Sequence, residues 1–264
     1  MDFYLLWVAI ILGIVEGATE FLPVSSTGHL IIASDLLNFN NTTHVVFEIV
    51  IQLGAILAVV MEYRKKLLAT LLGITREKSA QDLVVNLIIA FIPAAILGLC
   101  FHNQIKAHLF NPTTVSIALI IGGVAMIMIE KRVPKKANTS QTIKKSQALV
   151  VGIAQCLSLV PGVSRAASTI MGGVISGLDR KVATEFSFYL AIPIIFAASI
   201  FELMSNWDIL TIHDLPIFIA GFTAAFLSAT IVIRIFIRYV ANHTFIAFGW
   251  YRIIIGIITL YYFY

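Results

Sequence analysis

Six long apolar runs, each ended by polar or charged residues, dominate the pattern along the chain. A bilayer core about 30 Å thick takes roughly 20 apolar residues per helix. Runs close to this length predict membrane spans at residues 45–61, 83–101, 113–129, 183–203, 215–237 and 245–264. The pattern therefore predicts an all-α, polytopic membrane protein.

Two further apolar regions are too short and too interrupted to cross a bilayer. Pro23 and Gly28 break the first region, and Pro161 breaks the second. Their apolar arms are residues 3–15 and 30–33 in the first region, and 148–160 and 168–177 in the second. We expect each region to form a re-entrant helical hairpin that returns to the side from which it entered.

The composition excludes a soluble globular protein. The chain is 59% hydrophobic and 12% charged, with a mean hydropathy of +0.95. Its 264 residues have room for roughly six to eight spans and for no separate soluble domain. We therefore expect residues 1–264 to form a single integral membrane domain.

The basic residues lie in a few loops. Every lysine and arginine except Lys106, Arg165 and Arg252 falls within residues 63–82, 131–145, 180–181 or 234–238. All four segments lie on one side if six segments cross and the two hairpins do not. Cytoplasmic loops are the ones that carry excess lysine and arginine. The pattern predicts that both termini and the open end of the first hairpin lie outside. It gives no reason to expect a nucleic-acid partner, despite the net charge of +4.

The two hairpins resemble each other at an offset of 139 residues, which sets Glu16 against Gln155. The matching pairs are Gly13 with Gly152, Ile14 with Ile153, Thr19 with Ser158, Val24 with Val163, and Ser25 with Ser164. Three spans separate the hairpins, so they enter from opposite sides, as in an inverted-topology repeat. We expect one repeat at about 1–131 and the other at about 146–264, with both hairpin tips in one pocket near the midplane.

The first break carries two carboxylates. Glu16 and Glu20 are four residues apart and so share one helical face. Like charges at this depth need a cation, a proton or an arginine between them. A hard divalent cation with oxygen ligands would fit, and a protonated carboxyl bonded to backbone is the alternative.

Hydroxyls and an imidazole follow in Ser25-Ser26-Thr27-Gly28-His29. A helix that restarts here can direct its N-terminal amides at an anion. His29 can act as an acid, a base or a nucleophile. A simple helix cap and a packed histidine are the alternatives for this segment.

The second break carries Arg165, flanked by Ser164, Ser168 and Thr169. Its permanent charge and planar donor fork suit phosphate, and its alternative role is that of a counter-ion to Glu16 or Glu20. The two breaks together supply acid, base, hydroxyl and guanidinium groups, a set that suits phosphoryl chemistry on an anionic substrate. We interpret Arg252, about two turns inside the last span, as a side chain that snorkels to the interface.

These motifs resemble those of the undecaprenyl-diphosphate phosphatase family, the bacitracin-resistance type. Glu16-Gly-Ala-Thr-Glu20 matches its Glu/Gln-x-x-x-Glu motif, and Leu22-Pro-Val-Ser-Ser-Thr-Gly-His29 follows as in the family. Pro161-Gly-Val-Ser-Arg165 resembles its Pro-Gly-x-Ser-Arg-Ser-x-x-Thr motif, with Ala166 in place of the second serine. The resemblance runs essentially end to end and includes residues 47–54 and 186–188.

The resemblance implies hydrolysis of undecaprenyl diphosphate to the monophosphate and phosphate, which recycles the lipid carrier for peptidoglycan synthesis. It implies that Glu16 and Glu20 either hold a Mg²⁺ or Ca²⁺ ion or tune the general base. It also implies that Ser26 or His29 is the nucleophile or the general base. Arg165 would stabilise transferred charge. The residues expected to bind the diphosphate are Ser25, Thr27, Gln155, Ser164 and Thr169.

The resemblance also implies a place in the bacterial cytoplasmic membrane. The site would open to the periplasmic or outer face, and the polyprenyl tail would lie in lipid between spans. The sequence does not determine the oligomeric state, and a homodimer is one possibility.

A lipid-phosphate flippase or anion transporter is the alternative function, because inverted repeats and broken helices are typical of alternating access. Such a carrier would need the same anion pocket. A carboxylate pair beside a nucleophile candidate is needed only for turnover, and this favours the enzyme.

Overall fold

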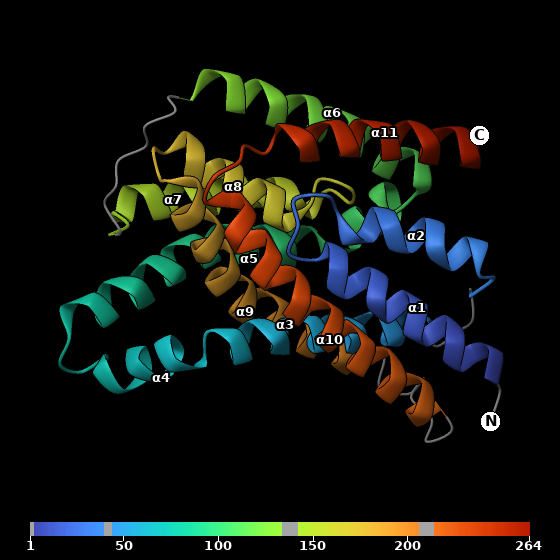
Figure 1. The fold of residues 1–264 in the computed structure, drawn as a ribbon, viewed down its shortest axis with the longest axis horizontal. Coiled ribbons are helices and arrows are strands. Elements are labelled where there is room, and N and C mark those ends of the chain that lie inside the picture. Colours follow the sequence, from blue (N-terminus) through green and yellow to red (C-terminus); the bar gives the residue numbers. More distant parts are fainter. Residues whose placement is uncertain (1–2, 40–43, 134–141, 206–213) are drawn as a thin grey trace.

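Helices make up the fold. The computed structural model describes residues 3–39, 44–133, 142–205 and 214–264, and within these ranges it contains no strand. Six of the described helices are long and apolar enough to cross a membrane, as predicted. They are α3 (His44–Glu62), α5 (Lys78–Leu109), α6 (Pro112–Arg132), α9 (Arg180–Ser205), α10 (Leu215–Val240) and α11 (Ile246–Phe263) (Figure 1).

Two of the predicted loops contain helix. The predicted polar link after residue 101 continues α5 as far as Leu109, because hydropathy marks only the part of a helix that is apolar. A short helix, α4 (Arg64–Gly73), forms within the predicted loop 63–82, since lysine, leucine and alanine are strong helix formers. Residues 134–141 of the third predicted loop lie outside the described residues.

Four shorter helices pack as two pairs at the positions where the hairpins were predicted. They are α1 (Phe3–Thr19), α2 (Ser26–Leu36), α7 (Lys145–Gln155) and α8 (Arg165–Ile175), with a 3₁₀ turn η1 (Cys156–Leu159) after α7. Helix α1 packs against α2, and α7 against α8. A hydrogen bond closes the open end of each hairpin. Tyr4 Oη donates to the Leu37 carbonyl at 2.8 Å in the first, and Gln147 Nε2 to the Ser176 carbonyl at 3.0 Å in the second.

The break in the first hairpin differs from the prediction. Residues 20–25 form the tip, so Pro23 lies in the break, but Gly28 lies inside α2. The second arm is therefore longer than the predicted 30–33. Gly28 has a packing role, because a Cβ atom there would lie 3.0 Å from the Leu119 side chain of α6.

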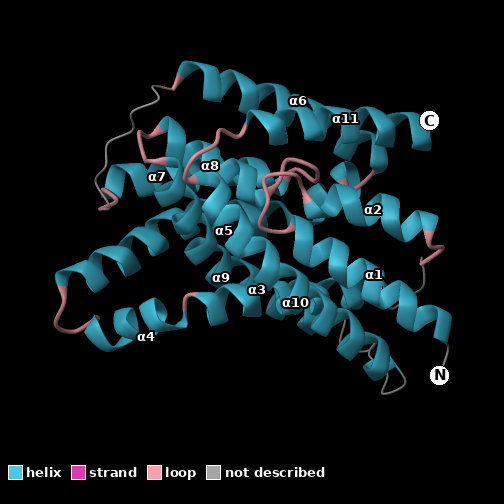
Figure 2. Ribbon diagram, viewed as in Figure 1, coloured by secondary structure: helices cyan, strands magenta, loops and turns pink. Residues whose placement is uncertain are grey.

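The two hairpin tips lie side by side near the centre of the molecule (Figures 1 and 2). Both chain termini lie at one end of its long axis, and α4 lies at the opposite end (Figure 1). Two ion pairs tie together helix ends that carry basic residues. Arg234 of α10 contacts Glu62 of α3 at 2.7 Å, and Arg180 of α9 contacts Glu130 of α6 at 2.7 Å.

Small residues allow the helices to approach closely. A Cβ atom on Gly17 of α1 would lie 2.2 Å from the Ala225 carbonyl oxygen of α10, and one on Gly123 of α6 would lie 2.5 Å from the Gly249 carbonyl oxygen of α11. In a bilayer the hydrophobic effect does not drive helices together, so close van der Waals packing of this kind stabilises their association instead. The α1–α10 contact fixes the helix that leads into the first tip.

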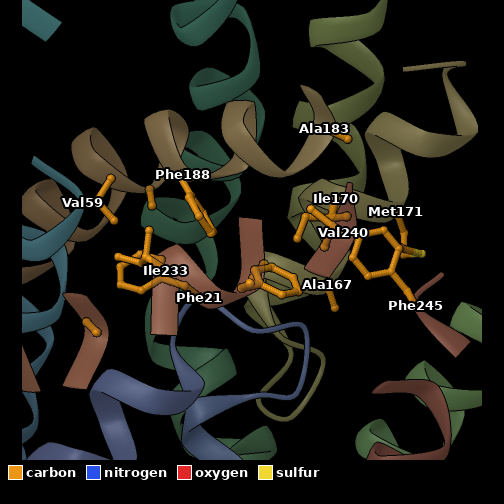
Figure 3. Close-up of a cluster of buried hydrophobic side chains, with 14 of the residues drawn as sticks. Phe21, Val59, Ala167, Ile170, Met171, Ala183, Phe188, Ile233, Val240 and Phe245 are labelled. Carbon is orange, nitrogen blue, oxygen red and sulfur yellow. The ribbon is translucent and has the colours of Figure 1, made fainter. Parts of the chain in front are cut away.

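The largest apolar cluster anchors that tip. Phe21 is fully buried, and its ring meets Phe188 of α9 edge-on with centroids 5.4 Å apart. Figure 3 shows Phe21 and Phe188 with Ile170 of α8 and Ile233 of α10 in the same cluster. The first hairpin is thereby held against elements of the second half of the chain.

Candidate active site

An ion pair joins the two hairpin tips. Arg165 Nη2, at the start of α8, donates to Glu20 Oε1 at 2.9 Å, and the side chains are only 11% and 7% exposed. The other carboxylate oxygen of Glu20 accepts a hydrogen bond from Ser26 Oγ at 2.5 Å. The predicted counter-ion contact is thus present, and it places a serine hydroxyl, a carboxylate and a guanidinium in one chain of contacts.

Arg165 is held from several sides. Its Nη1 donates to the Ser187 carbonyl oxygen at 3.2 Å, and its guanidinium carbon lies 5.7 Å from the centre of the Phe21 ring. Its Nε atom is buried and has no hydrogen-bond partner among the residues that the structure describes. The guanidinium therefore keeps a free donor while its orientation is fixed.

Thr169 lies behind Arg165 and supports it. Its hydroxyl contacts Ser187 Oγ at 2.6 Å and the Arg165 carbonyl oxygen at 2.9 Å. These bonds occupy a hydroxyl that was predicted to meet the substrate. Sequence reasoning did not assign Ser187 a role, although it lies in the segment 186–188 that carries part of the family resemblance.

Each tip ends in a serine that caps the following helix. Ser25 Oγ accepts from the Gly28 amide at 3.4 Å, and Ser164 Oγ from the Ala167 amide at 3.2 Å. Both serines have positive φ, 71° and 76°, which L-residues rarely adopt. Such strain costs about 1–3 kcal/mol and gathers at functional sites. The first-turn amides of α2 and α8 are thus brought to the tips, where helix N-termini attract anions.

Several buried polar atoms near the tips have no hydrogen-bond partner within the described part of the chain. Such groups are normally paired, so each calls for a ligand or an ordered water. They include Glu16 Oε1, Ser168 Oγ, Arg165 Nε and both side-chain polar atoms of Gln155. Glu16 and Gln155, which the repeat sets opposite each other, are both about 1% exposed. Thr27 is half-buried.

Glu16 fits one part of a cation site. It is buried one helical turn before Glu20, which carries the ion pair with Arg165. Within the described ranges, no group of three or more His, Cys, Asp or Glu side chains forms a complete cage. Mg²⁺ characteristically takes one or two carboxylates and completes its shell with substrate phosphates and water. The free Glu16 oxygen suits that arrangement.

His29 is fixed at both ring nitrogens. Nδ1 lies 2.8 Å from the Ser25 carbonyl oxygen, and Nε2 lies 2.7 Å from Tyr251 Oη of α11. The His29 and Tyr251 rings are stacked, with centroids 5.6 Å apart and planes at 5°. The sequence alone does not link Tyr251 to His29, because no local pattern connects residues so far apart.

The prediction that Arg252 snorkels to the interface is wrong. Its side chain is fully buried. It donates to the carbonyl oxygens of Pro23 at 3.2 Å, Ala118 at 3.3 Å and Gly162 at 3.0 Å. Intramembrane arginines usually face the protein interior. Applied to Arg252, this general rule would have predicted the buried position.

Known proteins match the chain over almost its whole length. Residues 9–258 match the model of the family described as bacitracin resistance protein BacA. A protein of Aromatoleum aromaticum named undecaprenyl-diphosphatase is 51% identical over 261 residues, which cover 98% of this chain and 95% of that protein. Proteins with the same name are 52% identical in Methylobacillus flagellatus, over 100% of both chains, and 53% identical in Nitrosospira multiformis, over 98% and 96%. The chain belongs to the bacitracin resistance protein BacA family.

Proposed function

We infer that this protein hydrolyses undecaprenyl diphosphate to undecaprenyl phosphate and inorganic phosphate, and so recycles the lipid carrier of cell-wall synthesis. The observation that carries this conclusion is the contact of Ser26 and Arg165 with the same carboxylate, Glu20, across the two hairpin tips. Relatives that match the whole chain are named undecaprenyl-diphosphatase. Binding and transport alone would not need a hydroxyl bonded to a carboxylate.

The contacts favour Ser26 as the nucleophile and Glu20 as its base. Ser26 Oγ attacks the terminal phosphorus while its proton passes to Glu20, the bond from that phosphorus to the bridging oxygen breaks, and the lipid monophosphate leaves. Water then cleaves the phosphoserine and releases phosphate. His29 is the less favoured nucleophile, because both of its ring nitrogens already have protein partners.

The diphosphate is held by charge and by backbone amides. Arg165 offers its free Nε–H, and the first turns of α2 and α8, capped by Ser25 and Ser164, offer amides. Such preorganised donors stabilise charge that moves during phosphoryl transfer. Gln155 and Thr27 complete the polar lining.

A divalent cation, Mg²⁺ or Ca²⁺, would bind at Glu16 together with Glu20 and the diphosphate. It would neutralise phosphate charge and so favour departure of the lipid monophosphate. Chelation with EDTA should abolish turnover, and Mg²⁺ or Ca²⁺ should restore it. Glu16→Gln should raise the cation concentration needed for half-maximal activity, and an unchanged requirement would contradict this role.

The helix lengths support re-entrant hairpins in an inverted repeat. Helices α2, α7 and α8 each have 11 residues and are about 16 Å long, short of a core about 30 Å thick. The contacts also pair symmetrically: α1 packs on α10 as α7 packs on α5, and α2 meets α11 as α8 meets α6. With basic loops inside, the first hairpin opens to the outer face of the cytoplasmic membrane, and the prenyl tail lies in lipid.

Phosphate release from a C55 or C15 prenyl diphosphate tests the function. Purified protein with Mg²⁺ or Ca²⁺ should release phosphate, whereas Glu20→Gln, His29→Ala and Arg165→Ala should each lower turnover by roughly 10²- to 10⁴-fold while remaining folded. Ser205→Ala, at the exposed end of α9, is the matched control. A folded wild-type protein that releases no phosphate under these conditions would overturn the phosphatase hypothesis. The flippase or transporter would then be the remaining hypothesis.

A further inference from the structure

Arg252 occupies a slot that is built for its guanidinium. It lies about two turns into α11, which packs against α6, and its side chain is fully buried. A Cβ atom on Gly122 of α6 would lie 2.3 Å from Arg252 Nη2. Any larger residue at position 122 would therefore displace the guanidinium, so the neighbouring helix leaves room for this one side chain.

The guanidinium bonds to both hairpin tips at once. Nη1 donates to the Pro23 carbonyl oxygen of the first tip at 3.2 Å, and Nη2 donates to the Gly162 carbonyl oxygen of the second tip at 3.0 Å. A third bond, to Ala118 at 3.3 Å, fixes it to α6. One rigid planar group thereby sets the position of the two tips relative to each other and to the α6–α11 pair.

No carboxylate of the described segments forms an ion pair with Arg252. Among the described residues its bonds are to carbonyl oxygens, and its Nε atom has no partner. Arg165, in contrast, is paired with Glu20. A buried cation without a counter-ion is costly. Arg252 directly follows Tyr251, whose hydroxyl contacts His29 Nε2 at 2.7 Å, so its charge lies beside the candidate site.

We propose that Arg252 is a positioning residue of the phosphatase site, which holds the two hairpin tips together and supplies positive charge to the diphosphate bound between them. The inference rests on the proposed function. Phosphoryl transfer depends on placing groups to within a fraction of an ångström, and a shift of about 1 Å can cost roughly 100-fold in rate. An anion between the tips provides the counter-charge that the protein itself omits.

Two substitutions separate position from charge. Arg252→Lys keeps the charge, but a single ammonium group cannot reach all three carbonyl oxygens in the same way. Its kcat should fall at least roughly tenfold, and its KM should stay within about threefold of wild type. Arg252→Met removes the charge as well, so its kcat should fall further and its KM should rise. Arg234→Lys, an exposed arginine of α10, is the matched control.

A second readout does not depend on turnover. Amide hydrogen exchange in the substrate-free protein should become faster at both tips, residues 20–25 and 160–164, in Arg252→Lys. Gly122→Ala should also make exchange faster at both tips, because its methyl group displaces the Arg252 guanidinium. Gly98→Ala, where the new methyl group would meet only Leu159 at 3.5 Å, should change neither tip.

The outcomes are distinct. Wild-type kcat and unchanged tip exchange in Arg252→Lys and Gly122→Ala overturn the inference. So does a kcat loss that only follows the folded fraction in thermal unfolding. If wild-type protein releases no phosphate, the proposed function fails instead, and the exchange data alone decide whether Arg252 holds the tips. Should Arg252→Met not fold, Arg252→Lys and Gly122→Ala still decide the question.

Discussion

At the scale of residues, the charged members of the site were predictable from the sequence. Glu16, Glu20 and Arg165 lie within apolar surroundings, where ionisable groups are rarely without a function. The contact of Arg165 with Glu20 was expected only as one of two choices, because the sequence does not determine which carboxylate an arginine reaches. The position of Arg252 was predicted wrongly. Its partners are backbone carbonyl oxygens, and because every residue carries one, the sequence does not mark which of them an arginine will reach.

Ser26 should prove to be the residue that is phosphorylated. Ser26→Ala should lower kcat by at least roughly 10³-fold, since its hydroxyl directly contacts Glu20, the proposed base. Rapid quenching of wild-type protein with labelled prenyl diphosphate should trap an acid-stable phosphoserine. An acid-labile phosphoenzyme that persists in Ser26→Ala would assign the nucleophile to His29 instead.

Gln155 should lower the stability of the folded protein and strengthen substrate binding. Its amide is buried without a partner in the described ranges, at a cost of about 1–3 kcal/mol. Gln155→Leu should therefore raise the midpoint of thermal unfolding by a few degrees and raise KM roughly tenfold. Gln147→Leu, which loses a bond to Ser176, should lower the midpoint and leave KM unchanged. A Gln155→Leu protein that is less stable and has normal KM would assign the amide a structural role.

At the scale of elements, hydropathy located the six long helices but not their ends. Membrane thickness limits the apolar part of a helix, whereas α5 continues through polar residues to Leu109 and α4 forms in a basic segment. The hairpin tips were located through Pro23 and Pro161, because proline disfavours the interior of a helix. Proline alone is not a sufficient signal, since α5 and α9 continue through Pro93 and Pro193. Gly28 gave a false signal, since glycine also serves close packing within helices.

The packing of α1 on α10 should control the position of Glu20. Gly17→Ala places a methyl group 2.2 Å from the Ala225 carbonyl oxygen, so the helices must separate. We expect a loss of about 1–3 kcal/mol in stability and a fall in kcat, since Glu20 directly follows the end of α1. Unfolding midpoints and phosphate release measure both effects. Wild-type values for both would show that α1 tolerates the shift.

At the scale of the whole molecule, the distribution of lysine and arginine predicted which segments would gather at the same end. The ion pairs of Arg234 with Glu62 and of Arg180 with Glu130 agree with this prediction. The meeting of the two tips was inferred from the weak internal repeat. Its detail, a shared arginine from the last helix, depends on three-dimensional packing that no short motif encodes.

The sidedness of the molecule can be measured by cysteine labelling. After replacement of Cys100 and Cys156, Tyr264→Cys should react with a membrane-impermeant maleimide on intact cells, because the C-terminal residue is 97% exposed and is predicted to lie outside. Arg76→Cys, in the exposed turn between α4 and α5, should react only after the membrane is opened. The reverse labelling would place the first hairpin on the cytoplasmic face.

The central claim is that the two hairpin tips form one catalytic site, and a double-mutant cycle tests it most directly. Glu20→Asp and Arg165→Lys weaken the 2.9 Å contact from each side and should leave measurable activity. If the residues act as a unit, kcat/KM of the double variant should be close to that of the more damaged single variant. A double variant whose loss equals the product of the two single losses would contradict the claim.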